Sequence, residues 1–226
     1  MYASYGRRSV IDGVDLELAP SERVILVGPN GSGKSTLLNV LTGVVPMDRG
    51  TITLSGEDFS RCPTDRRVCA GMSYLMQTRN VFLNLTVDEN LELAAPWDGE
   101  GDSRRALVLD TFPKLRNLIN RRAGLLSGGE RQALAVGLVL MRKAKVMLMD
   151  EPTAGLAPST AAAMLAAIHA VQEKDEFALL IIEHNIREVA PWASRALVMN
   201  HGRILAEERQ PVRLLDRSLL ERYYFT

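Results

Sequence analysis

Short apolar runs recur along the chain, and their pattern predicts β-strands that alternate with helices. Residues 23–27, 146–149 and 177–182 are nearly continuous apolar runs, which are typical of strands buried on both faces in a parallel sheet. Residues 10–18 alternate between apolar and polar side chains, so we expect a half-buried strand there. The expected strands are 10–18, 23–27, 51–54, 72–76, 146–149 and 177–182, with a hairpin formed by 196–199 and 203–206.

A different period between these strands predicts helices. Thr86 begins a helical pattern, and Glu89 follows three residues later, so the two residues match a capping box. Polar residues and glycines at 97–102 break this pattern, and we expect residues 84–140 to be a mostly helical insertion in the β/α rhythm. Further helices are expected at 103–112, 113–120 and 158–172, with a short helix within 211–226.

Length and charge limit the class of protein. The chain has 226 residues, 46% of them hydrophobic, which is enough for one domain with its own core and a subdomain grown out of it. Lys and Arg number 27, as do Asp and Glu, so no net charge points to nucleic acid or to a membrane surface. We expect the arginine pairs at 7–8, 104–105 and 121–122 to be solvated.

Cysteine content and hydropathy restrict the setting in which the chain works. Cys62 and Cys69 are expected to be free thiols, because two cysteines fit a reduced cytosolic compartment better than a disulfide framework, and a metal site would need further Cys or His residues nearby. No apolar run is long enough to span a bilayer, and the first residues lack a signal-peptide pattern. We therefore expect any membrane role to depend on a partner.

A glycine-rich segment follows the apolar run at 23–27 and precedes a helical pattern. Its residues, Gly28, Pro29, Asn30, Gly31, Ser32, Gly33, Lys34, Ser35 and Thr36, match G-x-x-x-x-G-K-[ST]. Glycines let successive backbone N–H groups turn toward an anion, and the following helix start adds its own donors. Lys34 is expected to reach the β- and γ-phosphates of a nucleotide, and Ser35 to bind Mg²⁺. A glycine turn with a chance Lys-Ser is the alternative, which the strand and helix on either side disfavour.

Two later segments suit nucleotide hydrolysis. Asp150 and Glu151 end a buried apolar run, where Asp150 is expected to hold Mg²⁺ through water and Glu151 to polarise an attacking water. An ordinary acidic pair at a strand end is the alternative. Residues 126–132 contain Ser127, Gly128, Gly129 and Glu130, whose simplest interpretation is a capping box. The glycines also expose the N–H groups of a helix start, a second anion site that makes sense if it closes on a nucleotide held by another subunit.

The motifs of this chain resemble, over essentially its whole length, those of the ATP-binding cassette (ABC) ATPase family: GPNGSGKST, Gln77, LSGGERQ, VMLMDE and His184, in this order. The resemblance implies an α/β fold, a P-loop NTPase cassette with a RecA-like core, an antiparallel β portion and an inserted helical subdomain at about 84–140. It implies a single ABC ATPase domain over residues 1–226 that binds ATP and Mg²⁺. It also implies a head-to-tail dimer, in which Lys34 of one subunit faces residues 127–129 of the other.

The resemblance assigns roles to single residues. Tyr5 would stack on adenine, unless it is only an exposed aromatic residue near the N-terminus. Gln77 would touch Mg²⁺ and the attacking water, and His184 would contact the γ-phosphate. The implied catalytic residues are thus Glu151, His184 and Gln77, and the implied Mg²⁺ site is formed by Ser35, Gln77 and Asp150. His169 and His201 lack such a context and are expected to be a helix-surface and a turn residue.

Three short segments resemble one group of importers within this family. Residues 151–158 (EPTAGLAP), 112–115 and 121–124 are similar to importers of branched-chain amino acids, urea and short amides. Most family members have an aspartate that crosses the dimer interface where this chain has Ala157, so that polar contact is not implied here.

The N-terminus departs from the family pattern. The family has a strand before the adenine-stacking aromatic residue, whereas residues 1–4 alone precede Tyr5. Either the first strand is missing or the chain starts differently, and we expect residues 2–9 to be a polar lead-in.

The main hypothesis is that the chain is the ATPase subunit of an ABC importer for branched-chain amino acids or related small amides. It would lie at the cytoplasmic face of the inner (cell) membrane as a peripheral protein. The implied partners are a second ABC ATPase subunit, transmembrane permease subunits and a solute-binding protein, with no nucleic acid. The permease would dock near residues 79–85, where Val81, Phe82, Leu83 and Leu85 are apolar enough to seat a helix, although burial in the core could explain some of them.

Two alternatives stay open at this point. The first is a soluble ABC ATPase without a transporter, acting on nucleic acid or ribosomes; such proteins usually have paired cassettes, a coiled coil or basic insertions, which this sequence lacks. The second is a nucleotide-gated binding module that does not hydrolyse ATP, against which Glu151 and His184 argue.

Overall fold

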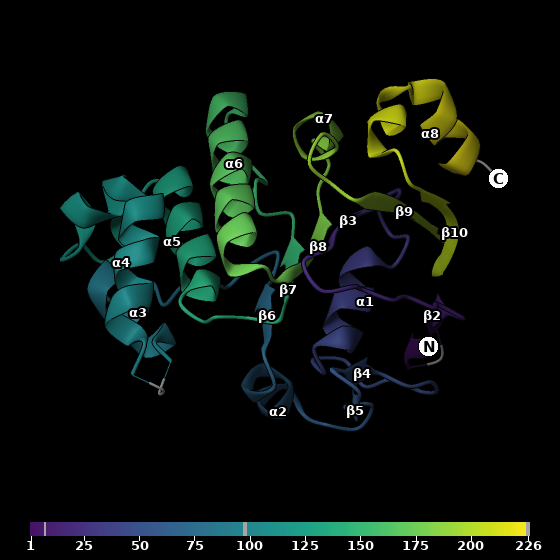
Figure 1. Ribbon diagram of the computed structural model, residues 1–226, viewed down its shortest axis with the longest axis horizontal. Helices are drawn as coiled ribbons and strands as arrows, with labels where there is room; N and C mark the ends of the chain where they lie inside the picture. The colour runs from purple at the N-terminus through teal and green to yellow at the C-terminus, as the bar shows by residue number, and fades with distance from the viewer. Residues whose placement is uncertain (7, 97–98, 225–226) are drawn as a thin grey trace.

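A six-stranded sheet forms the centre of the molecule (Figure 1). The structure, a computed structural model, describes residues 1–6, 8–96 and 99–224. The strand order is β10-β9-β3-β8-β7-β6, and every neighbouring pair is parallel except β9 and β10. The strands are β3 (Arg23–Val27), β6 (Met72–Leu75), β7 (Val146–Asp150), β8 (Ala178–Ile182), β9 (Arg195–Asn200) and β10 (Arg203–Glu208). The continuous apolar runs are therefore confirmed as the central strands β3, β7 and β8.

Each face of the sheet is covered by helices, which explains why the central strands are apolar throughout. Val24 and Leu26 of β3 pack in one core with α1 (Lys34–Leu41). Ile25 and Val27, on the opposite face, pack in a second core with α5 (Gly128–Leu140) and α6 (Pro158–Asp175). In Figure 1, α1 lies below the sheet and α6 above it.

A group of helices lies beyond the β6 edge of the sheet (Figure 1). It comprises α3 (Val87–Ala94), α4 (Gly101–Thr111), two 3₁₀ turns, η1 (Pro113–Leu118) and η2 (Ala123–Leu125), and α5. Thr86 and Glu89 form the predicted capping box at the start of α3. The helix predicted at 113–120 is a 3₁₀ helix instead, at Pro113–Leu118. The predicted break at 97–102 lies partly outside the described residues.

The prediction that the arginine pairs are solvated is wrong for Arg104. Its side chain is buried between helices, where it pairs with Asp175 at 2.5 Å and donates from Nε to the backbone oxygen of Leu140 at 3.0 Å. It therefore joins α4 to the C-terminal ends of α5 and α6. Arg105 pairs with Asp88 and is half-buried, whereas residues 121 and 122 are exposed as expected. Residue 7 lies outside the described residues.

The expected lead-in at residues 2–9 is a hairpin. Its strands are β1 (Tyr2–Tyr5) and β2 (Arg8–Asp12), which are antiparallel and pair Tyr5 with Arg8. A short strand therefore runs up to Tyr5, where the sequence predicted a polar lead-in. The strand expected at 10–18 ends at Asp12; residues 14–18 keep their apolar alternation because Val14 is buried and Leu16 and Leu18 pack on the core as irregular chain.

The remaining elements are short. They are β4 (Thr53–Leu54), β5 (Glu57–Asp58), α2 (Thr64–Cys69), α7 (Ile186–Val189), η3 (Pro211–Leu215) and α8 (Arg217–Tyr224). Cys62 and Cys69 are free thiols, and the described residues contain no group of three or more His, Cys, Asp or Glu side chains that could hold a metal ion. Among the helices of residues 1–6, 8–96 and 99–224, none is long and apolar enough to cross a bilayer.

Two histidines outside the predicted site differ in their surroundings. His201 is exposed in the β9–β10 turn, as predicted. His169 of α6 is more than a helix-surface residue, because its ring stacks on Trp192 with centroids 4.9 Å apart. Its Nε2 also lies 3.0 Å from Nη1 of Arg23. These contacts hold the chain after α7 against α6 and the start of β3.

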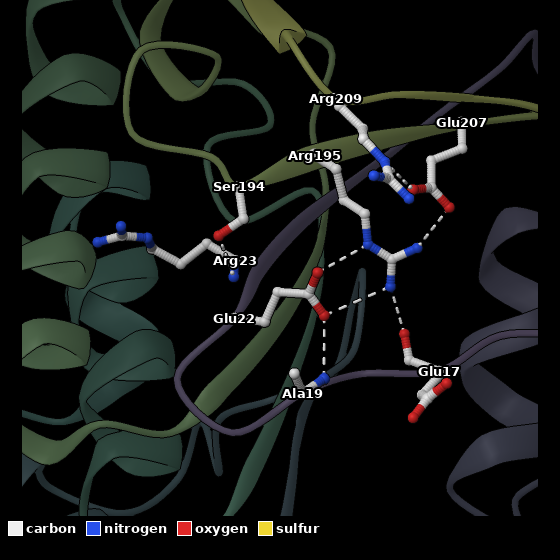
Figure 2. A network of polar contacts seen from close by, with 8 residues as sticks. All are labelled: Glu17, Ala19, Glu22, Arg23, Ser194, Arg195, Glu207 and Arg209. Atoms are coloured by element: carbon white, nitrogen blue, oxygen red, sulfur yellow. Dashed lines mark hydrogen bonds and ion pairs between the residues drawn. The ribbon is translucent and has the colours of Figure 1, made fainter.

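A network centred on Arg195 fixes the chain at the same end of β3, just before the strand begins (Figure 2). Arg195 donates to Glu22 Oε1 at 2.7 Å, to Glu207 Oε2 at 2.9 Å and to the backbone oxygen of Glu17. Burial alone would raise the pKa of Glu22, but hydrogen bonds from Arg195 and from the N–H of Ala19, together with the Arg195 charge, hold this pKa below its ordinary value. The network thereby joins the chain before β3 to β9 and β10.

Candidate functional site

One cleft collects the polar residues that follow the parallel strands. Such residues meet because the carboxyl ends of parallel strands lie at the same edge of the sheet. The cleft has a volume of about 600 Å³. It is lined by Tyr5, Arg8, Val10, Asn30, Gly31, Gly33, Lys34, Ser35, Thr36, Gln77, Glu151 and His184. Residues as far apart in the sequence as Tyr5 and His184 thus contribute to a single site.

The phosphate loop between β3 and α1 depends on two glycines. Gly33 has φ +106° and is the N-cap of α1, and a Cβ there would lie 3.0 Å from the backbone oxygen of Val10. A Cβ on Gly28 would lie 2.0 Å from the backbone oxygen of Met199, so this position has no room for a side chain. The loop can therefore turn its backbone N–H groups and the start of α1 toward an anion.

Lys34 is folded back onto this loop. Its Nζ donates to the backbone oxygens of Gly28 at 2.8 Å and Pro29 at 3.1 Å. Burial lowers the pKa of Lys34, while the nearby charges of Glu151 and Asp150 oppose this shift. A buried ammonium that has carbonyl oxygens as partners can gain stronger, charged partners when phosphate oxygens enter the cleft.

Asp150 is a buried carboxylate at the end of β7. Burial raises its pKa; a hydrogen bond from Ser35 and the charges of Lys34 and His184 oppose this shift, while Glu151 adds to it. Its Oδ1 has no hydrogen-bond partner within the described chain. A buried oxygen without a partner, on a carboxylate that accepts from the Ser35 hydroxyl, fits a hard cation such as Mg²⁺, which prefers oxygen ligands.

Glu151 is the residue at which the strand-end side chains meet. Its Oε1 lies 2.8 Å from Nε2 of His184, and its Oε2 accepts a hydrogen bond from Nε2 of Gln77 at 3.2 Å. Its backbone has φ +52°, an unusual conformation for a residue with a side chain. A carboxylate held in this way by an imidazole and an amide can orient a water molecule and accept its proton.

Tyr5 lies at the rim of the cleft, where its ring is exposed. Arg8 and Val10 also line the cleft and were not predicted from the sequence. They were missed because the β1–β2 hairpin was not predicted, and the pairing of Tyr5 with Arg8 brings the second strand of this hairpin to the cleft.

The segment around Ser127 lies apart from this cleft. Ser127 N donates to Glu130 Oε2 at 2.8 Å, and Glu130 N donates to Ser127 Oγ at 3.4 Å, which confirms the capping box at the start of α5. Hydrogen bonds from the Ser127 backbone N–H and from its side chain to the Glu130 carboxylate hold the pKa of Glu130 below the ordinary value. Residues 127–130 line a separate groove of about 590 Å³, together with residues 155–157. Within the described chain, the second helix start and the phosphate loop therefore do not share one cavity.

A contact that the sequence did not predict joins α5 to the loop after Glu151. Gln132 Nε2 donates to the backbone oxygen of Pro152 at 2.7 Å. Because Pro152 follows Glu151 directly, the helix that begins at Ser127 is linked to the loop that carries the carboxylate. The sequence places Gln132 one turn into α5, but it does not reveal which group a glutamine in a helix binds, so this contact could not be predicted.

The apolar segment at residues 79–85 is partly exposed. Phe82 is 61% exposed and Leu83 50%, whereas Val81 packs against the core. Asn90, buried in α3, fixes this segment by accepting from the N–H of Phe82 at 2.9 Å and donating to its carbonyl at 3.0 Å. The exposure of Phe82 and Leu83 is thus a property of an anchored segment.

Comparison with known proteins agrees with these observations. The family model described as ABC transporter matches residues 11–154. A protein of Archaeoglobus fulgidus named "Probable branched-chain amino acid transport ATP-binding protein LivF" is 39% identical over 204 residues, covering 89% of this chain and 86% of that protein. A protein of Pseudomonas aeruginosa named "High-affinity branched-chain amino acid transport ATP-binding protein BraG" is 33% identical over 221 residues, covering 97% of this chain and 94% of that protein.

A solved structure gives the same result for the fold. The crystal structure of a nucleotide-free ATP-binding cassette from an ABC transporter is similar with a TM-score of 0.86 and 30% identity, covering 98% of this chain and 95% of that one. The predicted fold class, a P-loop ABC cassette, is therefore confirmed. The chain belongs to the ABC transporter family and is the ATP-binding, ATP-hydrolysing subunit of such a transporter.

Proposed function

We propose that the cleft holds Mg²⁺-ATP with its triphosphate on the phosphate loop. Backbone N–H groups of the loop from Gly28 to Thr36, apart from Pro29 (which has no N–H), and the Lys34 ammonium would bind the phosphates, and Tyr5 would stack on adenine. Ser35, Gln77 and Asp150 would hold Mg²⁺, which supplies charge neutralisation at the phosphates when it is bound. The buried Asp150 Oδ1 without a partner in the described chain supports this assignment.

In the same proposal, Glu151 accepts a proton from the attacking water. His184 and Gln77 would orient this carboxylate and contact the γ-phosphate and the water. The observation that supports these roles best is the meeting of both side chains on Glu151, at 2.8 Å and 3.2 Å. The decisive variant is Glu151→Gln, which keeps the shape of the side chain but accepts a proton poorly. We expect it to bind ATP and to hydrolyse it at a small fraction of the wild-type rate.

We further propose that the complete site needs two subunits in a head-to-tail dimer. Ser127, Gly128, Gly129 and Glu130 would face the ATP on the phosphate loop of the partner subunit. Their position in a separate groove supports this arrangement, because a capped helix start with exposed glycines has no nucleotide to bind within its own chain. Residues 84–140 would act as a helical subdomain of a single ABC ATPase domain, 1–226.

For the transported solute, we propose branched-chain amino acids or related small amides. The names of the relatives LivF and BraG, and the similarity of residues 151–158 to such importers, support this class. Neither name points to nucleic acid or to the ribosome. The subunit would act at the cytoplasmic face of the cell membrane with permease subunits and a solute-binding protein.

The permease would contact the chain through the exposed side chains of Phe82 and Leu83. Two adjacent apolar side chains on an anchored segment are suited to seat a partner helix.

The proposed solute class is tested by reconstituting the chain in liposomes with the permease subunits encoded beside it and measuring ATP-dependent uptake of leucine. We expect uptake with the wild-type chain and its loss with Glu151→Gln; ATP-dependent uptake of other solutes alone would reject the proposed solute class.

A further inference from the structure

A buried carboxylate lies next to the proposed catalytic groups without lining the cleft. Glu183, between β8 and His184, is 5% exposed. Its Oε2 accepts a hydrogen bond from the Thr153 hydroxyl at 2.6 Å. Its Oε1 accepts from the backbone N–H groups of His184 at 2.9 Å and Asn185 at 3.2 Å. One side chain therefore binds two loops at once.

These two loops carry the groups that meet at the proposed reaction centre. Thr153 comes two residues after Glu151, and His184 comes directly after Glu183. The last backbone hydrogen bond between the two chain segments runs from the N–H of Glu151 to the oxygen of Ile182, at 2.9 Å. Past this bond the loops leave the sheet, so the Thr153–Glu183 hydrogen bond continues the connection.

The conformation of Glu151 makes such a connection important. Its φ of +52° is one that surrounding contacts must maintain, because a residue with a side chain rarely adopts it. Its carboxylate must also stay within hydrogen-bond distance of His184 to act on a water molecule. A small displacement of either loop would separate the two side chains.

We infer that Glu183 is a positioning residue for ATP hydrolysis. Through Thr153 and the backbone of His184, it holds the side chains of Glu151 and His184 within hydrogen-bond distance of each other. The inference rests on the proposed roles of Glu151 and His184. It differs from a purely structural role, in which the same hydrogen bonds would support the fold and all properties would decline together. Positioning affects the rate of hydrolysis and spares ATP affinity, since Glu183 and Thr153 do not line the cleft.

A matched pair of variants at Thr153 tests the inference in the full chain. Thr153→Val keeps the shape and removes the hydroxyl, whereas Thr153→Ser keeps the hydroxyl. We expect Thr153→Val to lower kcat at least about tenfold, with the Kd for ATP within about twofold of wild type, because small misplacements of reacting groups are costly. Thr153→Ser should hydrolyse ATP at close to the wild-type rate.

Two variants of Glu183 complete the set. Glu183→Gln retains an acceptor for the two backbone N–H groups and places an amide against the Thr153 hydroxyl, which can accept from it. We expect this variant to keep most of the activity. Glu183→Leu leaves three donors without an acceptor, and kcat should fall at least as far as in Thr153→Val.

The last step repeats Thr153→Val in a Glu151→Gln background. If Thr153 acts through Glu151, the second substitution adds little to the loss caused by the first. An unchanged kcat in Thr153→Val would overturn the positioning role while leaving the proposed base intact. So would a fall of kcat that is accompanied by clear losses of ATP affinity and of thermal stability. Wild-type hydrolysis by Glu151→Gln would instead reject the proposed base, and the positioning role with it.

Discussion

At the scale of single residues, the site is built from side chains whose charges are stabilised by short-range partners. Lys34 binds loop carbonyls, Asp150 keeps one buried oxygen without a partner in the described chain, and Glu151 binds His184 and Gln77. In the proposed site, the Lys34 ammonium would bind phosphate and this Asp150 oxygen would bind Mg²⁺. The phosphate-loop lysine is the residue whose contribution is simplest to measure.

Lys34→Ala removes the main cationic contact to phosphate in the proposed site. We expect the affinity for ATP to fall at least about tenfold, which corresponds to about 1.4 kcal/mol. Calorimetric titration with ATP measures this change directly. Lys145→Ala is the matched control, because this lysine contacts Ser55 outside the cleft and should bind ATP normally. Equal affinities in wild type and Lys34→Ala would reject the phosphate-loop assignment.

The lowered pKa of Glu22 predicts how stability depends on pH. Since the Arg195 hydrogen bond favours the charged form in the folded state, this carboxylate stabilises the fold above its unfolded pKa. The contribution is lost as the pH falls through the lower, folded pKa. We therefore expect the difference in unfolding free energy between wild type and Glu22→Gln to shrink between about pH 6 and about pH 3. Urea titrations at several pH values give this difference; a gap that is constant with pH would contradict the assignment.

At the scale of elements, sequence patterns predicted what local chemistry determines. The runs at β3, β7 and β8 are apolar because both faces of the sheet are covered, and the capping boxes at Thr86 and Ser127 need neighbouring residues alone. The β1–β2 hairpin was missed because strands of four and five mixed residues lack a clear period. Its position then determines that Arg8 and Val10 reach the cleft.

Long-range polar contacts were the other part that the sequence could not predict. Arg104 seemed to be a surface residue because its neighbour is also an arginine, yet it pairs with Asp175, 71 positions later. Glu183 and Thr153 likewise meet across 30 positions. Such pairs depend on how helices and loops pack, and a charge in the sequence does not reveal its partner.

The Arg104–Asp175 pair tests how firmly α4 is joined to the rest of the fold. Both side chains are largely buried, at 7% and 8% exposure. Arg104→Leu leaves Asp175 as a buried charge without this partner, so we expect the free energy of unfolding to drop by about 3 kcal/mol or more. Combining it with Asp175→Leu should recover part of the loss, because no charge is then left unpaired. Urea denaturation measures all three proteins; a loss below about 1 kcal/mol in Arg104→Leu would show that the pair contributes no more than a surface ion pair.

At the scale of the whole molecule, the residues proposed to bind nucleotide line two separate cavities of the chain. The cleft contains the phosphate loop, Glu151 and His184, and the separate groove contains Ser127 and the two glycines after it. In a head-to-tail dimer, the cleft of each subunit would face the Ser127 groove of its partner. Gln132 would then link the two sites within a subunit, because it binds the backbone next to Glu151 from the helix that begins at Ser127.

Mixing two inactive variants, Lys34→Ala and Ser127→Arg, tests this central claim most directly. In a head-to-tail heterodimer, one composite site carries both substitutions and the other carries neither. We expect mixing to restore ATP hydrolysis, up to about half of the wild-type activity per heterodimer if the sites act independently. ATP binding at the intact site is measured alongside, since strict cooperation between the sites would abolish hydrolysis but not binding. Heterodimers shown to form that recover neither ATP binding nor hydrolysis would mean that Ser127 serves its own subunit, which would contradict the two-subunit site.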